Sequence, residues 1–314
     1  MSLLPILTVA WRTTLRERRL WPYALFAGLG IGSGLGSAIF QLSGSDPSIT
    51  FFAALREPTQ AFGALGAIWT TAQANNWNGI AGILTYEILI IAVVAAIAWL
   101  TILGANALVI AASHTARAEQ IPTNIRQRAQ QQFWPAAAVQ VSAKILAILI
   151  ITAVDVTYTW AAFTATATPA IVATTAFVVA GLMLAVIHIT TAYAIAAIVL
   201  GRRPPTAAFR DATNLIRKHY RVTAITTVIL SGVNVVGLIV ALLGGFLLSL
   251  PFLFLGGIGV TRGIISLITA STIVGIIIIA AWLAVVAATL TTFIATTWTL
   301  LYLRLTQPEE EPKM

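Results

Sequence analysis

The chain has 314 residues, of which 59% are hydrophobic and only 9% are charged, and its formal net charge is +8. Soluble domains carry about 25% charged residues, so a chain this apolar cannot keep its surface in water, and lipid must be the solvent for most of it. The sequence contains no cysteine, which excludes disulfides, thiolate catalysis and cysteine-ligated metals.

Six segments are apolar over roughly the 20 residues that a membrane-spanning helix needs. They are residues 20–42, 81–112, 136–164, 170–200, 222–255 and 269–303. The first is too long for a cleaved signal sequence and no clear cleavage site follows it, so we interpret it as a retained helix. The sequence therefore predicts an all-α, polytopic membrane bundle with a single transmembrane domain over residues 1–306. The polar residues 307–314 are expected to form a disordered cytoplasmic tail.

Similar basic segments precede the first, third and fifth spans. Segment 13–22 reads TTLRERRLWP, segment 123–135 reads TNIRQRAQQQFWP, and segment 207–220 reads AAFRDATNLIRKHY. Each has an apolar residue followed by Arg and an acid or amide, and each ends on an aromatic residue or just after one, where a long apolar stretch begins. This internal repeat predicts three transmembrane hairpins, each preceded by a basic helix at the membrane interface.

The basic residues are distributed unequally between the two sides of the predicted bundle. Of the 18 Lys and Arg residues, all but Arg56, Lys144 and Arg262 lie in the N-terminal segment, the second and fourth connections or the tail. The positive-inside rule therefore places both termini in the cytoplasm and the protein in the cytoplasmic membrane of the cell. Aromatic residues near the inner boundaries are expected to form an interfacial belt: Trp21, Trp134, Tyr220, Trp298 and Tyr302.

Two outer connections have distinct compositions. In residues 43–80, Phe51, Phe62 and Trp69 belong to an apolar pattern with helical spacing, which predicts one or two amphipathic helices on the outer surface. Residues 256–271 are rich in glycine and contain one charge. They are expected to form either a turn or a re-entrant segment.

Four ionisable residues fall within the predicted spans: Glu87, Lys144, Asp155 and His188. Such residues are costly in hydrocarbon and are candidates for a polar transport pathway. The structural interpretation, which we favour, places Glu87 and Asp155 near the outer interface, lets Lys144 extend to the inner interface, and makes His188 a satisfied core residue.

Two patterns of small or hydroxyl side chains favour helix packing. Gly28, Gly32 and Gly36 recur every four residues in the first span, and this spacing lets helix backbones approach closely, either within the chain or between copies. Thr residues at 289, 292, 296 and 299 form a stripe in the last span. A hydroxyl-lined pore would have this pattern, but Thr more often returns its hydroxyl to a backbone carbonyl.

The basic segments supply candidate contacts to anionic headgroups of the inner leaflet, at about 1 kcal/mol per residue, or to a cytoplasmic or membrane protein partner. A third interpretation is that they act only as topology signals. Their division among short connections at the membrane face argues against nucleic acid. The candidate residues are Arg16, Arg126, Arg128, Arg202, Arg203, Arg210, Arg217 and Lys218.

Three stretches carry a family resemblance: VAWRTTLRERRLWPYALFAGLG, GANALVIAASHTARAEQIPTNIRQRAQQQFWP and GRRPPTAAFRDATNLIRKHY. They resemble bacterial six-span membrane proteins of unknown function, related to the membrane domain fused to some glycerophosphodiester phosphodiesterases. The resemblance implies a six-helix fold with three hairpins and implies no activity. No soluble domain is present to hold phosphodiesterase chemistry, so the link suggests only a lipid or envelope role by analogy.

The sequence contains no HExxH, no GxSxG and no paired acids at metal spacing, so no catalytic, cofactor or metal site is predicted. We expect a non-enzymatic scaffold or accessory subunit in envelope or transport processes. The alternative is a small-solute, ion or lipid transporter that uses an intramembrane polar cavity.

Overall fold

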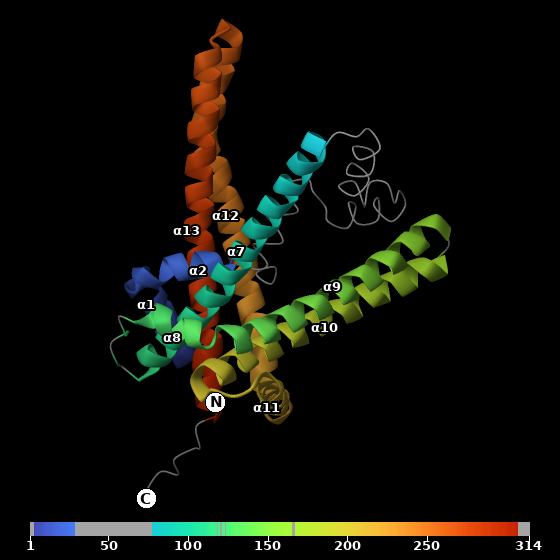
Figure 1. The fold of residues 1–314 in the computed structure, drawn as a ribbon, viewed down its shortest axis with the longest axis vertical. Coiled ribbons are helices and arrows are strands. Elements are labelled where there is room, and N and C mark those ends of the chain that lie inside the picture. Colours follow the sequence, from blue (N-terminus) through green and yellow to red (C-terminus); the bar gives the residue numbers. More distant parts are fainter. Residues whose placement is uncertain are drawn as a thin grey trace, which may run out of the picture. The chain divides into compact units, whose positions relative to one another are not determined.

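A computed structural model describes residues 3–28, 77–117, 119, 121, 122, 124–164 and 167–306, and all regular structure in these residues is helical. This confirms the predicted all-α class. The elements, labelled in Figure 1 where there is room, are α1 (Leu4–Arg16), the 3-10 turn η1 (Arg18–Leu20), α2 (Trp21–Gly28), α7 (Trp77–Ala116), α8 (Ile125–Gln131), α9 (Phe133–Thr164), α10 (Ala167–Gly201), α11 (Pro205–Lys218), α12 (Tyr220–Arg262) and α13 (Ile265–Thr306).

Five helical segments are long and apolar enough to cross a membrane: Ala95–Ala116, Phe133–Ala161, Ile171–Gly201, Tyr220–Arg262 and Ile265–Thr306. The described part of the chain is therefore that of a multi-pass membrane protein. Of the first predicted span, 20–42, only α2 is described. The amphipathic helices predicted for the first outer connection, up to residue 76, and the predicted tail lie outside the described residues.

The three basic segments form short helices that are separate from the spans. One residue, Gln132, separates α8 from α9, and one residue, His219, separates α11 from α12. Both leave the α-helical region, with φ and ψ of −103° and 16° at Gln132 and −122° and 35° at His219. Between α1 and α2 the break consists of Glu17 and the turn η1. In each case the aromatic end of the basic segment begins the next helix.

The first basic helix begins earlier than the sequence motif does. α1 starts at Leu4, and Pro5 occupies its first turn, where a missing N–H costs little. Arg16 closes α1, and Arg18 and Arg19 fall in η1, so the motif at 13–22 marks the end of a helix and the start of α2. The cations favour this position because the helix C-terminus carries partial negative charge.

α12 and α13 form a long hairpin around a tight turn. Gly263 takes the left-handed conformation with φ of 66°, which glycine adopts without steric cost, and the Ile264 N–H donates to the Gly259 carbonyl at 2.8 Å. The turn expected within 256–271 is therefore present, but its predicted bounds were too wide, since helix continues to Arg262 and resumes at Ile265. At Gly259 the missing Cβ makes room for Ile268 of α13.

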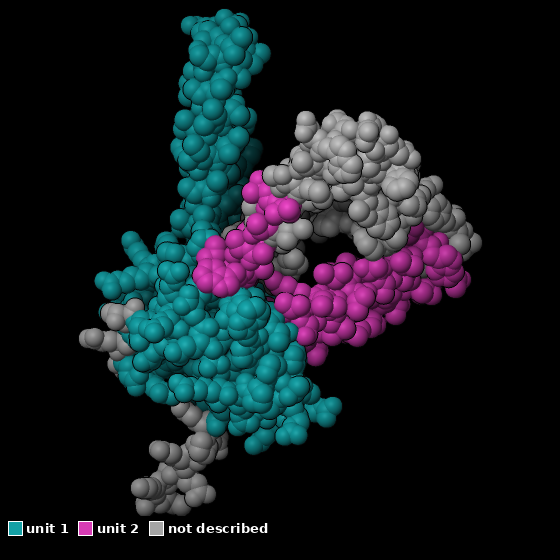
Figure 2. Space-filling view, viewed as in Figure 1, with its two compact units in different colours: residues 1–28, 102–140, 189–314 teal, residues 29–101, 141–188 magenta. Residues whose placement is uncertain are grey.

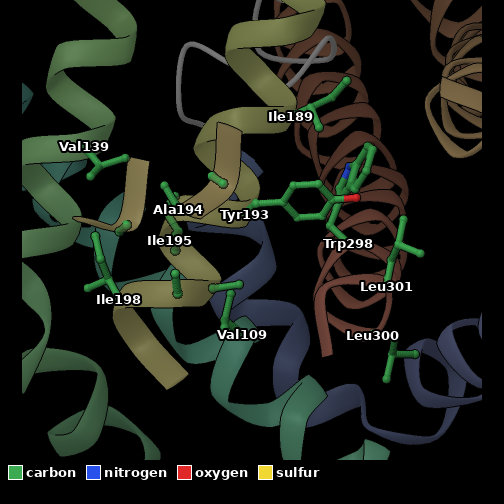
Figure 3. Close-up of a cluster of buried hydrophobic side chains, with 14 of the residues drawn as sticks. Val109, Val139, Ile189, Tyr193, Ala194, Ile195, Ile198, Trp298, Leu300 and Leu301 are labelled. Carbon is green, nitrogen blue, oxygen red and sulfur yellow. The ribbon is translucent and has the colours of Figure 1, made fainter. Parts of the chain in front are cut away.

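The chain divides into two compact units, coloured separately in Figure 2. Unit 1 comprises Met1–Gly28, Ile102–Gln140 and Ile189–Met314, and unit 2 comprises Leu29–Thr101 and Val141–His188. The main core of unit 1 gathers side chains from α1, α7 and α9 to α13 around the fully buried Tyr193, which projects from α10 toward Trp298 in Figure 3.

Candidate functional site

The strongest candidate surface is the outward face of α11. Pro205 follows the extended Pro204 and opens the helix, and the fully buried Ala208 and Ala212 set one face against the core of unit 1. The side chains of Arg210, Arg217 and Lys218, and those of Thr206, Thr213 and Asn214, are exposed. Small residues of α11 face the core and basic residues face outward, so α11 is an amphipathic helix whose uncovered face is polar.

The turn before α11 adds two more cations. Arg202 ends α10 with a φ of 51°, the only positive φ of a non-glycine residue in the described chain, and its N–H donates to the Ile198 carbonyl at 2.9 Å. Arg203 forms an ion pair with Asp211 of α11, and both arginines are exposed. We define the α11 basic face as Arg202, Arg203, Arg210, Arg217 and Lys218.

The second basic segment is held against α7. The Nδ2 of the fully buried Asn106 donates to the carbonyls of Ala129 and Gln132, at 3.2 and 3.4 Å, and so caps the end of α8. The Nη1 of Arg128 lies 3.4 Å from the Nε2 of His114, and the Nδ1 of His114 lies 2.8 Å from Glu119. These contacts fasten α8 with its arginines outward.

The candidate cations of the first and second segments are also exposed. Arg16 lies at the exposed end of α1, and both Arg126 and Arg128 are exposed on α8. Trp21 holds the turn between α1 and α2 in place. Its indole donates to the Thr14 carbonyl at 3.0 Å, and the Arg18 guanidinium lies 5.9 Å from its ring centroid. All the predicted basic contact residues therefore have exposed side chains.

The intramembrane candidates belong to unit 2. Lys144 and Asp155 on α9 are half-buried, His188 on α10 is exposed, and Asp155 has an interaction partner. The expectation that His188 is a satisfied core residue stays a prediction. Glu87 belongs to the same unit, but its side chain lies outside the described residues. Among the described residues, no three His, Asp or Glu side chains could together hold a metal ion.

Gly28 and the threonine stripe are packing features. A Cβ on the buried Gly28 would lie 2.8 Å from the hydroxyl of Thr291 in α13, so the glycine serves contact within the chain, while Gly32 and Gly36 lie outside the described residues. The hydroxyls of Thr289, Thr292 and Thr299 donate to carbonyls one turn back in α13, at 2.7–2.8 Å. These three hydroxyls return their protons to their own helix, as Thr in helices commonly does.

The aromatic prediction was wrong at Trp298 and missed Tyr193. Trp298 is buried and packs edge-to-face on Tyr193 at a centroid distance of 5.5 Å, whereas Trp134 and Tyr220 are exposed, and their place in an interfacial belt stays a prediction. The Tyr193 hydroxyl lies 3.3 Å from that of Thr223. An aromatic residue with a hydroxyl in the middle of an aliphatic span is the sequence signal that could have identified this contact.

Comparison of the chain with protein-family models, with curated proteins and with solved structures gave no match.

Proposed function

We propose that the protein is a non-enzymatic, six-span protein of the cytoplasmic membrane that serves as a scaffold or accessory subunit in envelope or transport processes. The proposal includes three hairpins, each preceded by a basic helix, and both termini on the cytoplasmic side. The resemblance to membrane domains of some glycerophosphodiester phosphodiesterases supports an envelope setting by analogy. Anionic headgroups of the inner leaflet and a cytoplasmic or membrane protein are the proposed partners.

The α11 basic face is the observation that carries this proposal. Five cations are exposed between residues 202 and 218, and the single acid of this segment, Asp211, is already paired with Arg203. One of the five, Arg202, is held in a left-handed conformation that costs an L-residue roughly 1–2 kcal/mol. Strain of this kind clusters at functional sites. An exposed, under-neutralised cationic surface on a rigid helix suits an acidic surface of a protein partner.

Site-specific photo-crosslinking in cells tests the proposal. A photoreactive residue at Thr213 or Asn214, both exposed on α11, should give a protein adduct of one defined mass. Replacement of Arg210, Arg217 and Lys218 by Gln should abolish it. Ile148, an exposed apolar residue of α9, is the matched control and should give no such adduct. An adduct that is absent, or that survives the loss of the three charges, contradicts the docking role.

A second candidate function, transport, is favoured by one observation. Glu87, Lys144, Asp155 and His188 all fall in unit 2, although they lie on three helices, α7, α9 and α10, from two separate stretches of the chain. A polar pathway would require such grouping. Cation or proton flux in reconstituted vesicles tests this function, with Asp155→Asn as the variant and Asp211→Asn as a control carboxylate outside the spans. Flux that is abolished only by Asp155→Asn would favour transport over the scaffold.

A further inference from the structure

The α12–α13 hairpin is much longer than a bilayer is thick. α12 has 43 residues and α13 has 42, so each extends about 64 Å at 1.5 Å per residue. A bilayer is about 40–45 Å thick including its headgroups. Residues 222–261 and 263–303 contain no charged side chain, so charge along the hairpin does not itself say which part lies in lipid.

Helix α1 indicates where the inner membrane surface crosses the hairpin, because it runs antiparallel to α13. Leu3, just before α1, and Leu7 in its first turns line an apolar crevice together with Thr297 and Leu301. Two turns further along α1, Trp11 packs edge-to-face on Phe293 at a centroid distance of 6.0 Å. The exposed guanidinium groups of Arg12 and Arg16 follow directly. The Trp11–Phe293 contact therefore places them near the level of Phe293, which lies about 16 Å from Arg304 along α13 by helix rise.

Burial along α13 increases gradually toward this level, because the side chains between Ile279 and Thr291 are mostly half-buried. From Thr292 to Leu301 nearly every side chain is buried or half-buried against protein, including four threonines and Trp298. From Ile265 to Ile278 most side chains are exposed. The first stretch has a protein environment, and the second has the open apolar surface that lipid covers.

We infer that Arg12 and Arg16 mark the inner membrane surface on this hairpin and contact headgroup phosphates there. The lipid-crossing part of α13 then runs from Ile265 to about Phe293, which is about 42 Å long. On α12 the same level falls near Asn234, because Gly237 packs on Leu290 and Gly244 packs on Trp282. Residues 220–233 and 294–306 stand on the cytoplasmic side, within a protein-packed membrane-proximal body. This inference rests on the proposed function and deepens it, since it assigns the proposed headgroup contact and the membrane level to Arg12 and Arg16 of α1.

The inference shifts the centre of the bilayer on α12 from the middle of the predicted span 222–255, near Ile239, to about Leu248. Because the chain has no cysteine, single-cysteine spin labels can be placed along the exposed face of α12 in the full chain, reconstituted in phosphatidylglycerol–phosphatidylcholine vesicles. Suitable exposed positions are Val228, Ser231, Val235, Ile239, Leu243, Leu247, Leu250 and Phe254. Collision with oxygen reports lipid, and collision with a water-soluble nickel chelate reports water.

The expected result is a maximum of the oxygen-to-nickel ratio at Leu247 or Leu250, with Ser231 accessible to nickel. A maximum at Ile239 or earlier overturns the inference. A second arm tests the role of the arginines. In the Arg12→Gln, Arg16→Gln variant the maximum should move toward Ile239, whereas Arg217→Gln, which removes an exposed cation from α11, should leave it in place. An unchanged profile in the double variant shows that α1 does not set the membrane level.

Discussion

Tyr193 is the largest fully buried side chain of the described residues, and it joins three helices. Its ring contacts Trp298 and Tyr302 of α13, and its hydroxyl lies near Thr223 of α12. Sequence patterns could not predict this role, because periodicity shows which face of a helix is apolar but does not identify the neighbouring helix. For the same reason Trp298 was assigned to the interface and the buried cap by Asn106 was missed.

Truncation of Tyr193 should separate the packing of its ring from its hydrogen bond. Tyr193→Ala is expected to destabilise unit 1 by about 3–5 kcal/mol through the cavity left behind, while Tyr193→Phe should cost about 0.5–1.5 kcal/mol. Thermal unfolding in detergent measures both. Tyr158→Ala, at an exposed position of α9, is the control and should change the unfolding temperature little. Equal losses for Ala and Phe would show that the ring contributes nothing beyond its hydroxyl.

Substitution of Arg202 should change the stability of the protein and its binding to a partner in opposite directions. Its positive φ suits glycine, so Arg202→Gly should relieve roughly 1 kcal/mol of strain, partly offset by the greater freedom of glycine in the unfolded chain. The unfolding temperature should therefore rise slightly. The crosslinked adduct from Thr213 should weaken, because one cation of the α11 basic face is lost. A variant that loses both stability and adduct would mean that the Arg202 side chain is needed for folding.

At the scale of elements, the apolar runs predicted the five long helices well, but not their ends. The predicted spans 136–164 and 170–200 lie within three residues of α9 and α10, because charged or proline-containing connections flank them. The predicted ends near 255 and 269 were wrong by several residues, because glycine runs that resemble a loop remain helical when a neighbouring helix packs closely on them. Such contacts cannot be read from one helix.

A pair of glycines in long helices tests this close packing. A Cβ on Gly104 of α7 would overlap the Tyr23 carbonyl of α2, whereas a Cβ on Gly181 of α10 would meet nothing within 4 Å. Gly104→Ala should therefore force α2 away and lower the unfolding temperature. Gly181→Ala should be neutral or slightly stabilising, because alanine has the better helix propensity by about 1 kcal/mol. A Gly104→Ala protein as stable as the Gly181→Ala protein would refute the close approach of α2 and α7.

At the scale of the whole molecule, the sequence predicted a membrane protein with three related basic segments, and the structure shows five long apolar helices and three short basic ones. Orientation stays a prediction that follows from the positive-inside rule. From the sequence, function could be predicted only as far as an exposed basic face. Recognition depends on the surface of a partner, and local patterns in this sequence do not encode that surface.

Cysteine labelling tests the orientation directly. A cysteine at Asn214 of α11 should react with a membrane-impermeant maleimide only after the membrane is permeabilised. A cysteine at Thr261, next to the α12–α13 turn, should react in intact cells. Both positions are exposed, so access to the reagent depends on membrane side alone. The reverse pattern would invert the proposed topology.

The turn at Gly263 has a consequence for biosynthesis. Side chains of α12 and α13 pack against glycines of the other helix along the hairpin, at Gly237, Gly244, Gly259 and Gly275. Neither helix has these contacts when it is alone. During translation α12 leaves the ribosome first, and its glycines are then uncovered. They gain their packing partners only when α13 follows through the two-residue turn. We therefore expect α12 and α13 to become stably packed in the bilayer only as a pair, and a chain that ends within α13 to leave α12 open to membrane quality control.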